Sequence, residues 1–214
     1  ESLESVVMPT RITSIGSFAF SGCKSLEEIK LPDTLMAIGK YAFSGCEKLS
    51  GVKIPDNVTK IEERQFSGCK NLSALELPRN LKSIDEFAFN ECVSLKNVDL
   101  PVNLLSVDGF SGCTGLRTMI IPNHVTTLGN FSNCVNLEAI KIPPSVKNIT
   151  VPFTNCPELM NITWEHLSEN IAKFPAYHKT VVEKRKAENK CTHCGGDFKL
   201  ISKTCKVCGL KKDY

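Results

Sequence analysis

The sequence predicts a mainly β, right-handed solenoid of short strands and turns, followed by two smaller C-terminal segments. Three observations carry this prediction. Seven cysteines recur at intervals of 21 to 23 residues, a phenylalanine precedes each of them, and a fixed pattern of aliphatic residues follows each of them. Self-similarity at such a period is typical of a chain that stacks one short coil upon the next.

The repeat is aligned on its cysteines and phenylalanines. The cysteines are Cys23, Cys46, Cys69, Cys92, Cys113, Cys134 and Cys156. The phenylalanine three positions earlier is Phe20, Phe43, Phe66, Phe89, Phe110, Phe131 or Phe153. Apolar residues follow each cysteine at three, six and eight positions, as in Leu26, Ile29 and Leu31. This frame predicts that every coil adds one strand to a continuous sheet, with its apolar residues facing the interior.

A second short strand is expected in each coil. A proline such as Pro32 follows the third aliphatic residue in six of the seven coils, and it ends the first strand because it has no N–H for the ladder. Apolar residues then recur three and six positions after the proline, as at Leu35 and Ile38. From the fifth coil the insertion seen at residues 39–42 shortens to residues 108–109, so the coil tightens by two residues.

The repeat resembles the BspA-like class of leucine-rich repeats over residues 1–164. Residues 15–20 (Ile-Gly-Ser-Phe-Ala-Phe) and 38–43 (Ile-Gly-Lys-Tyr-Ala-Phe) keep the whole signature. The third coil departs from it, because Glu62, Arg64 and Gln65 replace the glycine, the aromatic residue and the alanine. The resemblance implies a curved, right-handed leucine-rich-repeat solenoid that recognises proteins, often at bacterial surfaces, and that carries no catalytic residues.

Three segments are expected along the chain. Residues 1–164 form the solenoid of about seven coils, and Leu3, Val6 and Met8 already fit its frame, so we expect an N-terminus truncated within a repeat of a longer protein. The frame ends at Trp164. Residues 165–190 are predicted to form a helical cap and connector, with Pro175 opening the second helix, and residues 191–214 form a small zinc ribbon.

The zinc ribbon is predicted from two C-x-x-C-G motifs separated by ten residues. Cys191, Cys194, Cys205 and Cys208 can supply four thiolates to one tetrahedral structural Zn²⁺. About twenty residues cannot build a core unaided, so the metal would supply most of the folding free energy. Four sulfur ligands leave no open position for a catalytic water. Iron shares this ligand set, and a redox dithiol is the other alternative.

A candidate partner-binding face lies on the first strands. The residue seven positions after each cysteine is expected to point outward, which selects Lys30, Lys53, Glu76, Asp99, Ile120 and Lys141. Their mixed charges suit a protein partner. They lack the aromatic platforms of a single-strand binder and the uniform positive stripe of a duplex binder. The sequence therefore predicts a non-catalytic scaffold for protein–protein interaction.

Nucleic-acid binding through the tail is the alternative function. Residues 165–214 carry a net charge of +5, whereas residues 1–164 carry −2. The four histidines stand in no catalytic or metalloprotease spacing, so neither an enzyme nor a small-molecule substrate is expected. The apolar runs are far shorter than the roughly 20 residues of a membrane span.

The cysteines also bear on the compartment. One cysteine per coil predicts buried, unpaired thiols, and these thiols together with a zinc ribbon favour the reducing cytoplasm. The resemblance to the BspA-like class, whose members are often found at bacterial surfaces, implies the bacterial cell surface or secretion as the alternative location.

Overall fold

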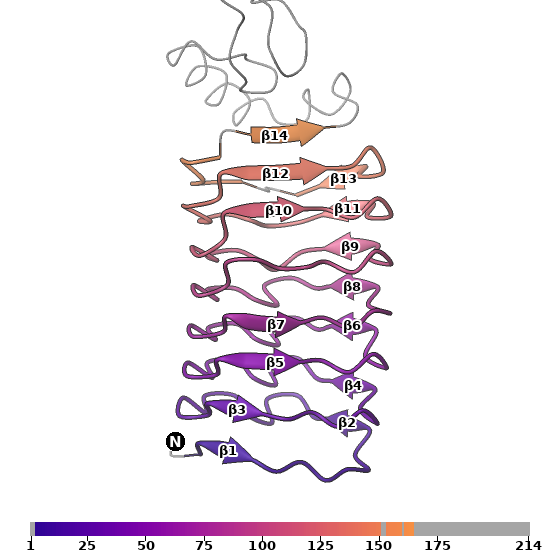
Figure 1. Ribbon diagram of the computed structural model, residues 1–214, viewed down its shortest axis with the longest axis vertical. Coiled ribbons are helices and arrows are strands. Elements are labelled where there is room, and N and C mark those ends of the chain that lie inside the picture. Colours follow the sequence, from indigo (N-terminus) through magenta and orange to yellow (C-terminus); the bar gives the residue numbers. More distant parts are fainter. Residues whose placement is uncertain (1–2, 151–152, 160, 165–214) are drawn as a thin grey trace, which may run out of the picture.

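The chain forms a stack of similar coils, and all but one of those described have a short strand on one side and a second on the other (Figure 1). This computed structural model describes residues 3–150, 153–159 and 161–164. The predicted helical cap at 165–190 and the zinc ribbon at 191–214 lie outside the described residues. Within the described ranges there is no helix, and so none that could cross a membrane.

The first strands of the coils form two parallel sheets on one side of the stack. The strands are β1 (Ser5–Val6), β3 (Glu28–Ile29), β5 (Gly51–Lys53), β7 (Ala74–Glu76), β10 (Thr118–Ile120), β12 (Ala139–Ile142) and β14 (Asn161–Trp164). Their orders are β1-β3-β5-β7 and β10-β12-β14. Equivalent residues of successive coils pair, so Lys53 lies beside Glu76 and Ile120 beside Lys141.

The expected continuous sheet is wrong in one coil. No strand is assigned at residues 97–99, between β7 and β10, although Val98 still turns inward and is 9% exposed. The break coincides with the change from coils of 23 residues to coils of 21 residues. The inward-facing pattern thus continues through a coil whose first segment makes no ladder, although its second strand, at residues 106–107, pairs on both sides.

The second strands confirm the prediction made from the residues after each proline. They are β2 (Ser14–Ile15), β4 (Ala37–Ile38), β6 (Lys60–Ile61), β8 (Ser83–Ile84), β9 (Ser106–Val107), β11 (Thr127–Leu128) and β13 (Asn148–Ile149). β2 pairs with β4, and the others form a parallel sheet in the order β13-β11-β9-β8-β6. Leu35 and Ile38 are buried, as their spacing predicts.

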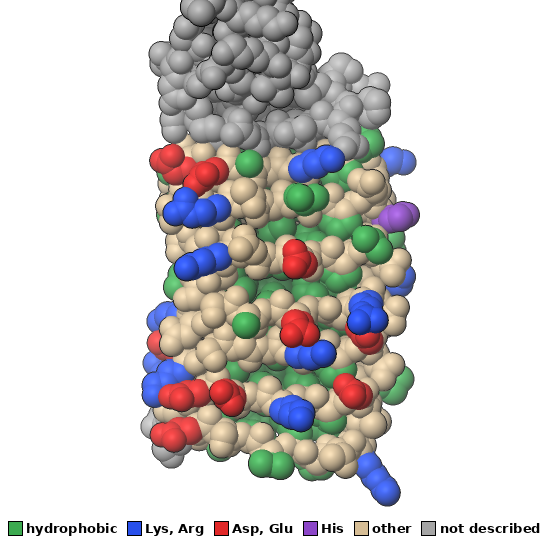
Figure 2. All heavy atoms as spheres, in the orientation of Figure 1, with side chains coloured by type: hydrophobic (Ala, Val, Ile, Leu, Met, Phe, Trp, Pro, Cys, Tyr) green, Lys and Arg blue, Asp and Glu red, His purple; other side chains and the backbone are tan. Residues whose placement is uncertain are grey.

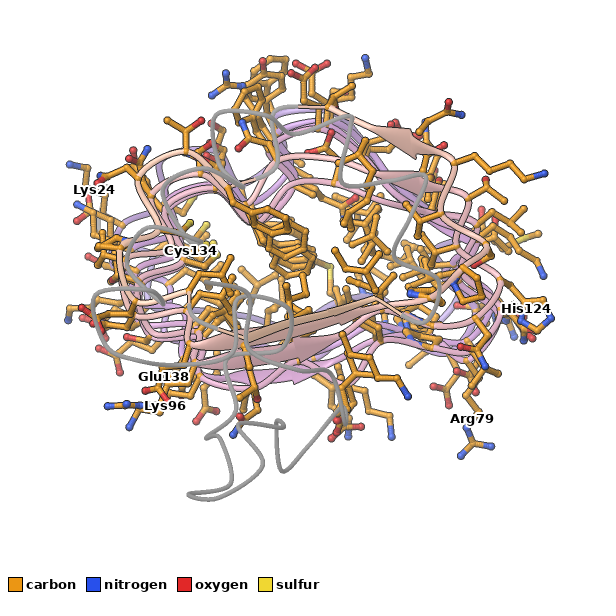
Figure 3. All side chains as sticks on the ribbon, turned by 90° about the horizontal axis from the view of Figure 1, so that it is seen from above. Lys24, Arg79, Lys96, His124, Cys134 and Glu138 are labelled. Carbon is orange, nitrogen blue, oxygen red and sulfur yellow. The ribbon has the colours of Figure 1, made fainter. Side chains whose placement is uncertain are left out.

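The core between the two strand sides contains a column of phenylalanine rings (Figure 3). Phe43, Phe66, Phe89, Phe110 and Phe131 are fully buried. Successive rings from Phe20 to Phe131 lie 5.3–5.6 Å apart between centroids and within 19° of parallel, the offset-stacked range that aromatic pairs favour. No coil could bury its ring alone, so the column couples each coil to the next.

A ladder of thiols runs beside the rings. All seven solenoid cysteines are free, and all but Cys23 are buried, which confirms the prediction of buried unpaired thiols. Each buried thiol donates to the carbonyl of the phenylalanine one coil earlier; for example, Cys69 Sγ lies 3.2 Å from Phe43 O and Cys134 Sγ 3.1 Å from Phe110 O. Figure 3 shows Cys134 inside the stack. Burial raises the pKa of Cys134 to about 12.

The turn before each cysteine needs a left-handed backbone. Glycine meets this need at Gly22, Gly45, Gly68 and Gly112, but Glu91 takes the position with φ 60° and Asn133 with φ 62°. A left-handed conformation costs a residue with a Cβ roughly 1–2 kcal/mol, and asparagine tolerates it better than glutamate does. The turn before Cys92 therefore holds strain that the equivalent glycine turns avoid.

Replacing Glu91 with glycine is expected to stabilise the chain. Relief of the strain exceeds the added entropy of the unfolded chain, so the free energy of unfolding should rise by about 0.5–1 kcal/mol. Asn133→Gly is the matched control and should change it by less than half as much. Urea denaturation of the two variants beside the parent chain checks this, and a Glu91→Gly chain less stable than the parent would contradict it.

Candidate protein-binding face

The exposed side of the first strands is termed the strand face. Its outer row consists of the residues seven positions after each cysteine. Lys53 is one of them, and it is exposed between buried Val52 and buried Ile54 because side chains alternate between the two faces of a strand. The structure exposes every residue that the sequence selected here: Lys30, Lys53, Glu76, Asp99, Ile120 and Lys141. The pairing of β1 with β3 adds Val7 to the row, beside Lys30 and 96% exposed.

A leading row of exposed residues lies where the chain enters each first strand, four positions after the cysteine. It consists of Glu4, Glu27, Ser50, Ser73, Lys96, Arg117 and Glu138. Figure 3 shows Lys96 and Glu138 pointing away from the core at the same edge of the stack. Acidic residues occupy the first two coils of this row and basic residues the fifth and sixth, whereas in the outer row lysines occupy the second and third coils, after Val7.

A middle row of small residues separates the two charged rows. In the ladder Glu28 pairs with Gly51, and Gly51 with Ala74, while Thr118 pairs with Ala139 in the second sheet. The period of two in the strands could have revealed this row, but the sequence reasoning did not use it. Because most of these side chains are short, the strand face is flat along its centre, and Figure 2 shows charged groups arranged on this side of the stack.

Ion pairs on the strand face are exposed. Lys53 Nζ lies 3.4 Å from Glu76 Oε2, and both side chains are more than 70% exposed. Glu27 pairs with Lys48 at 2.9 Å, which raises the pKa of Lys48 through their hydrogen bond. Such exposed pairs are screened by solvent and contribute little to stability. These side chains are thus available to a partner at little cost in stability.

A different ladder, which the sequence analysis missed, lies two residues before the column phenylalanine in each of the first four coils. Phe18 stacks on Tyr41 with centroids 4.7 Å apart, and the guanidinium of Arg64 lies 4.4 Å from the ring centroid of Phe87. All four residues have a positive φ. Arg64, which breaks the aromatic pattern of the repeat, therefore keeps the stacking through a cation–π contact.

The predicted zinc ligands Cys191, Cys194, Cys205 and Cys208 fall outside the described residues. In the part of the chain that the structure does describe, no group of three or more histidine, cysteine, aspartate or glutamate side chains could hold a metal ion. The buried solenoid thiols, which donate to carbonyl groups, belong to the core.

Solved structures of other leucine-rich-repeat proteins are similar to this chain. A leucine-rich-repeat protein from Bacteroides ovatus is 27% identical with a TM-score of 0.47, and the match covers 75% of this chain and 63% of that one. The T. pallidum leucine-rich-repeat protein is 24% identical with a TM-score of 0.47, covering 73% and 78%. The pneumococcal vaccine antigen PcpA is 20% identical with a TM-score of 0.50, covering 74% and 50%, and supports the fold alone.

The chain thus spans less than two thirds of the length of the Bacteroides ovatus protein. No curated protein matches the sequence. The family described as BspA-type leucine-rich-repeat region matches it in six copies, over residues 1–109 and 106–197. The chain therefore belongs to the BspA-type leucine-rich-repeat family.

Proposed function

We propose that this chain is a non-catalytic scaffold that binds a protein partner through the strand face. The observation that carries the proposal is the pair of charged rows, which run the length of the solenoid on either side of a flat centre. Side chains in rows on a parallel sheet keep a fixed spacing of about 4.8 Å, so they present a preorganised pattern. Complementary charges on a partner would set both orientation and specificity.

Reversal of the charges on the strand face is expected to abolish capture of the partner. The variant is Lys30→Glu, Glu76→Lys, Asp99→Lys and Lys141→Glu, which leaves the net charge unchanged. It changes only exposed side chains, so the fold should persist. The measurement is a pull-down from an extract of the source organism with the full chain and with this variant as baits.

The matched control moves the same number of charges elsewhere. Arg11→Glu, Asp33→Lys, Lys82→Glu and Glu86→Lys are all exposed and lie outside the strand face, and they also leave the net charge unchanged. The control should retain the partner. Equal capture by both variants would contradict the proposal, and recovery of nucleic acid, released steeply by salt, would favour the basic tail as the working part instead.

The chemistry of the four C-terminal cysteines supports a structural role for a metal. Two C-x-x-C-G motifs provide a complete thiolate set for Zn²⁺, and we propose that Cys191, Cys194, Cys205 and Cys208 hold it. The zinc would fold residues 191–214 and would take no part in partner chemistry. Such thiolates persist in a reducing compartment, so we place the chain in the cytoplasm.

One zinc ion per chain is expected on purification without added metal. Cys194→Ser or Cys208→Ser should lose most of it, because three thiolates and no replacement ligand bind zinc far more weakly. Cys134→Ser, in the solenoid, is the control and should retain it. Elemental analysis of the parent chain and of these variants measures the bound metal. Iron in place of zinc, or no metal at all, would overturn the assignment.

A further inference from the structure

We infer that the strand face binds a second copy of this chain in an isologous dimer; this deepens the proposed function and rests on it. The two-fold axis lies between β5 and β7 and runs along the strand direction. Such an axis reverses the order of the coils in the partner and places each row opposite the same row. The charges of the strand face are complementary to themselves about this axis.

Over its first six coils, from Val7 to Ile120, the outer row matches its own reverse in every position; Lys141, in the seventh coil, lies outside this match. Read from the first coil, the row is apolar, positive, positive, negative, negative and apolar: Val7, Lys30, Lys53, Glu76, Asp99 and Ile120. In the dimer Lys53 faces the partner's Glu76 and Lys30 faces the partner's Asp99. Val7 faces the partner's Ile120, and these two apolar side chains are 96% and 69% exposed in one chain.

The leading row matches its own reverse with the opposite polarity. It reads negative, negative, neutral, neutral, positive and positive over the same six coils: Glu4, Glu27, Ser50, Ser73, Lys96 and Arg117. Glu4 faces the partner's Arg117, Glu27 faces the partner's Lys96, and Ser50 faces the partner's Ser73. No like charges meet in either row.

Two other placements of a second copy match the charges less completely. An axis moved by half a coil, onto β7, places Glu76 against itself and Glu4 against the partner's Glu138, which are like-charge contacts. An axis along the solenoid would place each residue of the leading row opposite the outer row of the same coil. Glu27 would then face the partner's Lys30, and Lys96 the partner's Asp99, which are opposite charges. Arg117, however, would face the partner's Ile120, and Glu4 the partner's Val7, so two charges would meet apolar side chains. Of these placements, the axis between β5 and β7 is the one that sets every charge of the two rows in the first six coils opposite a charge of the other sign.

The centre of the proposed interface permits close approach. Gly51 and Ala74 flank the axis in the middle row, and Gly51 would face the partner's Ala74 across it. Lys53 and Glu76 already pair within one chain at 3.4 Å, so the four side chains around the axis would alternate in sign. Among the described residues Lys30 and Asp99 have no ion pair within the chain, and three coils of about 4.8 Å keep them apart.

Charge exchange between Lys30 and Asp99 tests the dimer. The full chain should sediment as a dimer at about 0.02 M salt and dissociate towards monomer at about 0.5 M, where exposed charges are screened. Lys30→Asp alone and Asp99→Lys alone each create two like-charge contacts per dimer, which should raise the dissociation constant by about tenfold or more. The double variant should restore the dimer, and Lys82→Asp, outside the strand face, should leave it unchanged.

The double variant distinguishes a contact between two chains from an effect within one chain. Since Lys30 and Asp99 lie too far apart to contact each other in one chain, restoration requires contact between chains. A chain that stays monomeric at every concentration, or a dimer that ignores both single reversals, overturns the inference. If the chain is monomeric and reversal of the strand face still removes a partner in the pull-down, the proposed function stands; if reversal also has no effect, both fail.

Discussion

Phe66→Ala is expected to lower the free energy of unfolding by about 3–5 kcal/mol, the range for a large aromatic side chain removed from a close-packed core. Phe66 is fully buried, and its ring lies 5.3 Å from that of Phe43 and 5.6 Å from that of Phe89. The substitution leaves a cavity and interrupts the column on both sides. Because each coil is stabilised mainly by its neighbours, we expect the loss to weaken cooperativity along the stack.

Phe18→Ala is the matched control for this prediction. Phe18 is 58% exposed and stacks on a single ring, that of Tyr41. Its removal should cost less than about 1.5 kcal/mol, the upper range for one aromatic pair. Urea denaturation followed by circular dichroism measures both variants. Similar costs for the two substitutions would show that the phenylalanine column does not hold the coils together.

Alkaline pH is expected to destabilise the solenoid through its buried thiols. Burial raises the pKa of Cys46 and Cys134 to about 12 and that of Cys156 to about 11, and it also raises the pKa of Cys69, Cys92 and Cys113. In the unfolded chain a cysteine titrates near 8.5. Between these values the unfolded state has lost protons that the folded state keeps, so the free energy of unfolding falls as pH rises.

The slope is about 1.4 kcal/mol for each pH unit and each buried thiol between roughly pH 9 and the folded pKa. Below the unfolded pKa this contribution is fully present. Cys134→Ala removes one such group, so its cost relative to the parent should be about 2 kcal/mol smaller at pH 10 than at pH 7. Denaturation of both chains at the two pH values gives this difference. An equal cost at pH 7 and pH 10 would refute the thiol origin.

The sequence predicted the buried residues of this protein closely, because the same pattern of apolar residues occurs in seven coils. The spacing of the phenylalanines, the cysteines and the aliphatic frame identified residues that the structure buries. The prolines located the ends of the first strands, and Leu35 and Ile38 identified the second strand. These predictions succeed since a solenoid coil is a local unit whose apolar residues must all face one interior.

Two structural features of the coils could not be predicted from the repeat pattern. At Val98 the frame is intact, yet residues 97–99 make no ladder at the point where the coil length changes. At Arg64 the frame is broken, yet the side chain stacks on Phe87 in place of an aromatic ring. Ladder pairing and stacking depend on the neighbouring coil, which the spacing within one coil does not describe.

The sequence by itself determined the period, the two strands of each coil, the inward residues and the individual outward residues of the outer row. Only the tertiary structure decided that these outward residues form rows with opposite polarity, and that Val7 and Glu4 continue them. The physical reason is the register of the parallel ladder. It brings residues 21 to 23 positions apart to within about 4.8 Å, so the pattern of charge that a partner meets exists only when the coils are stacked.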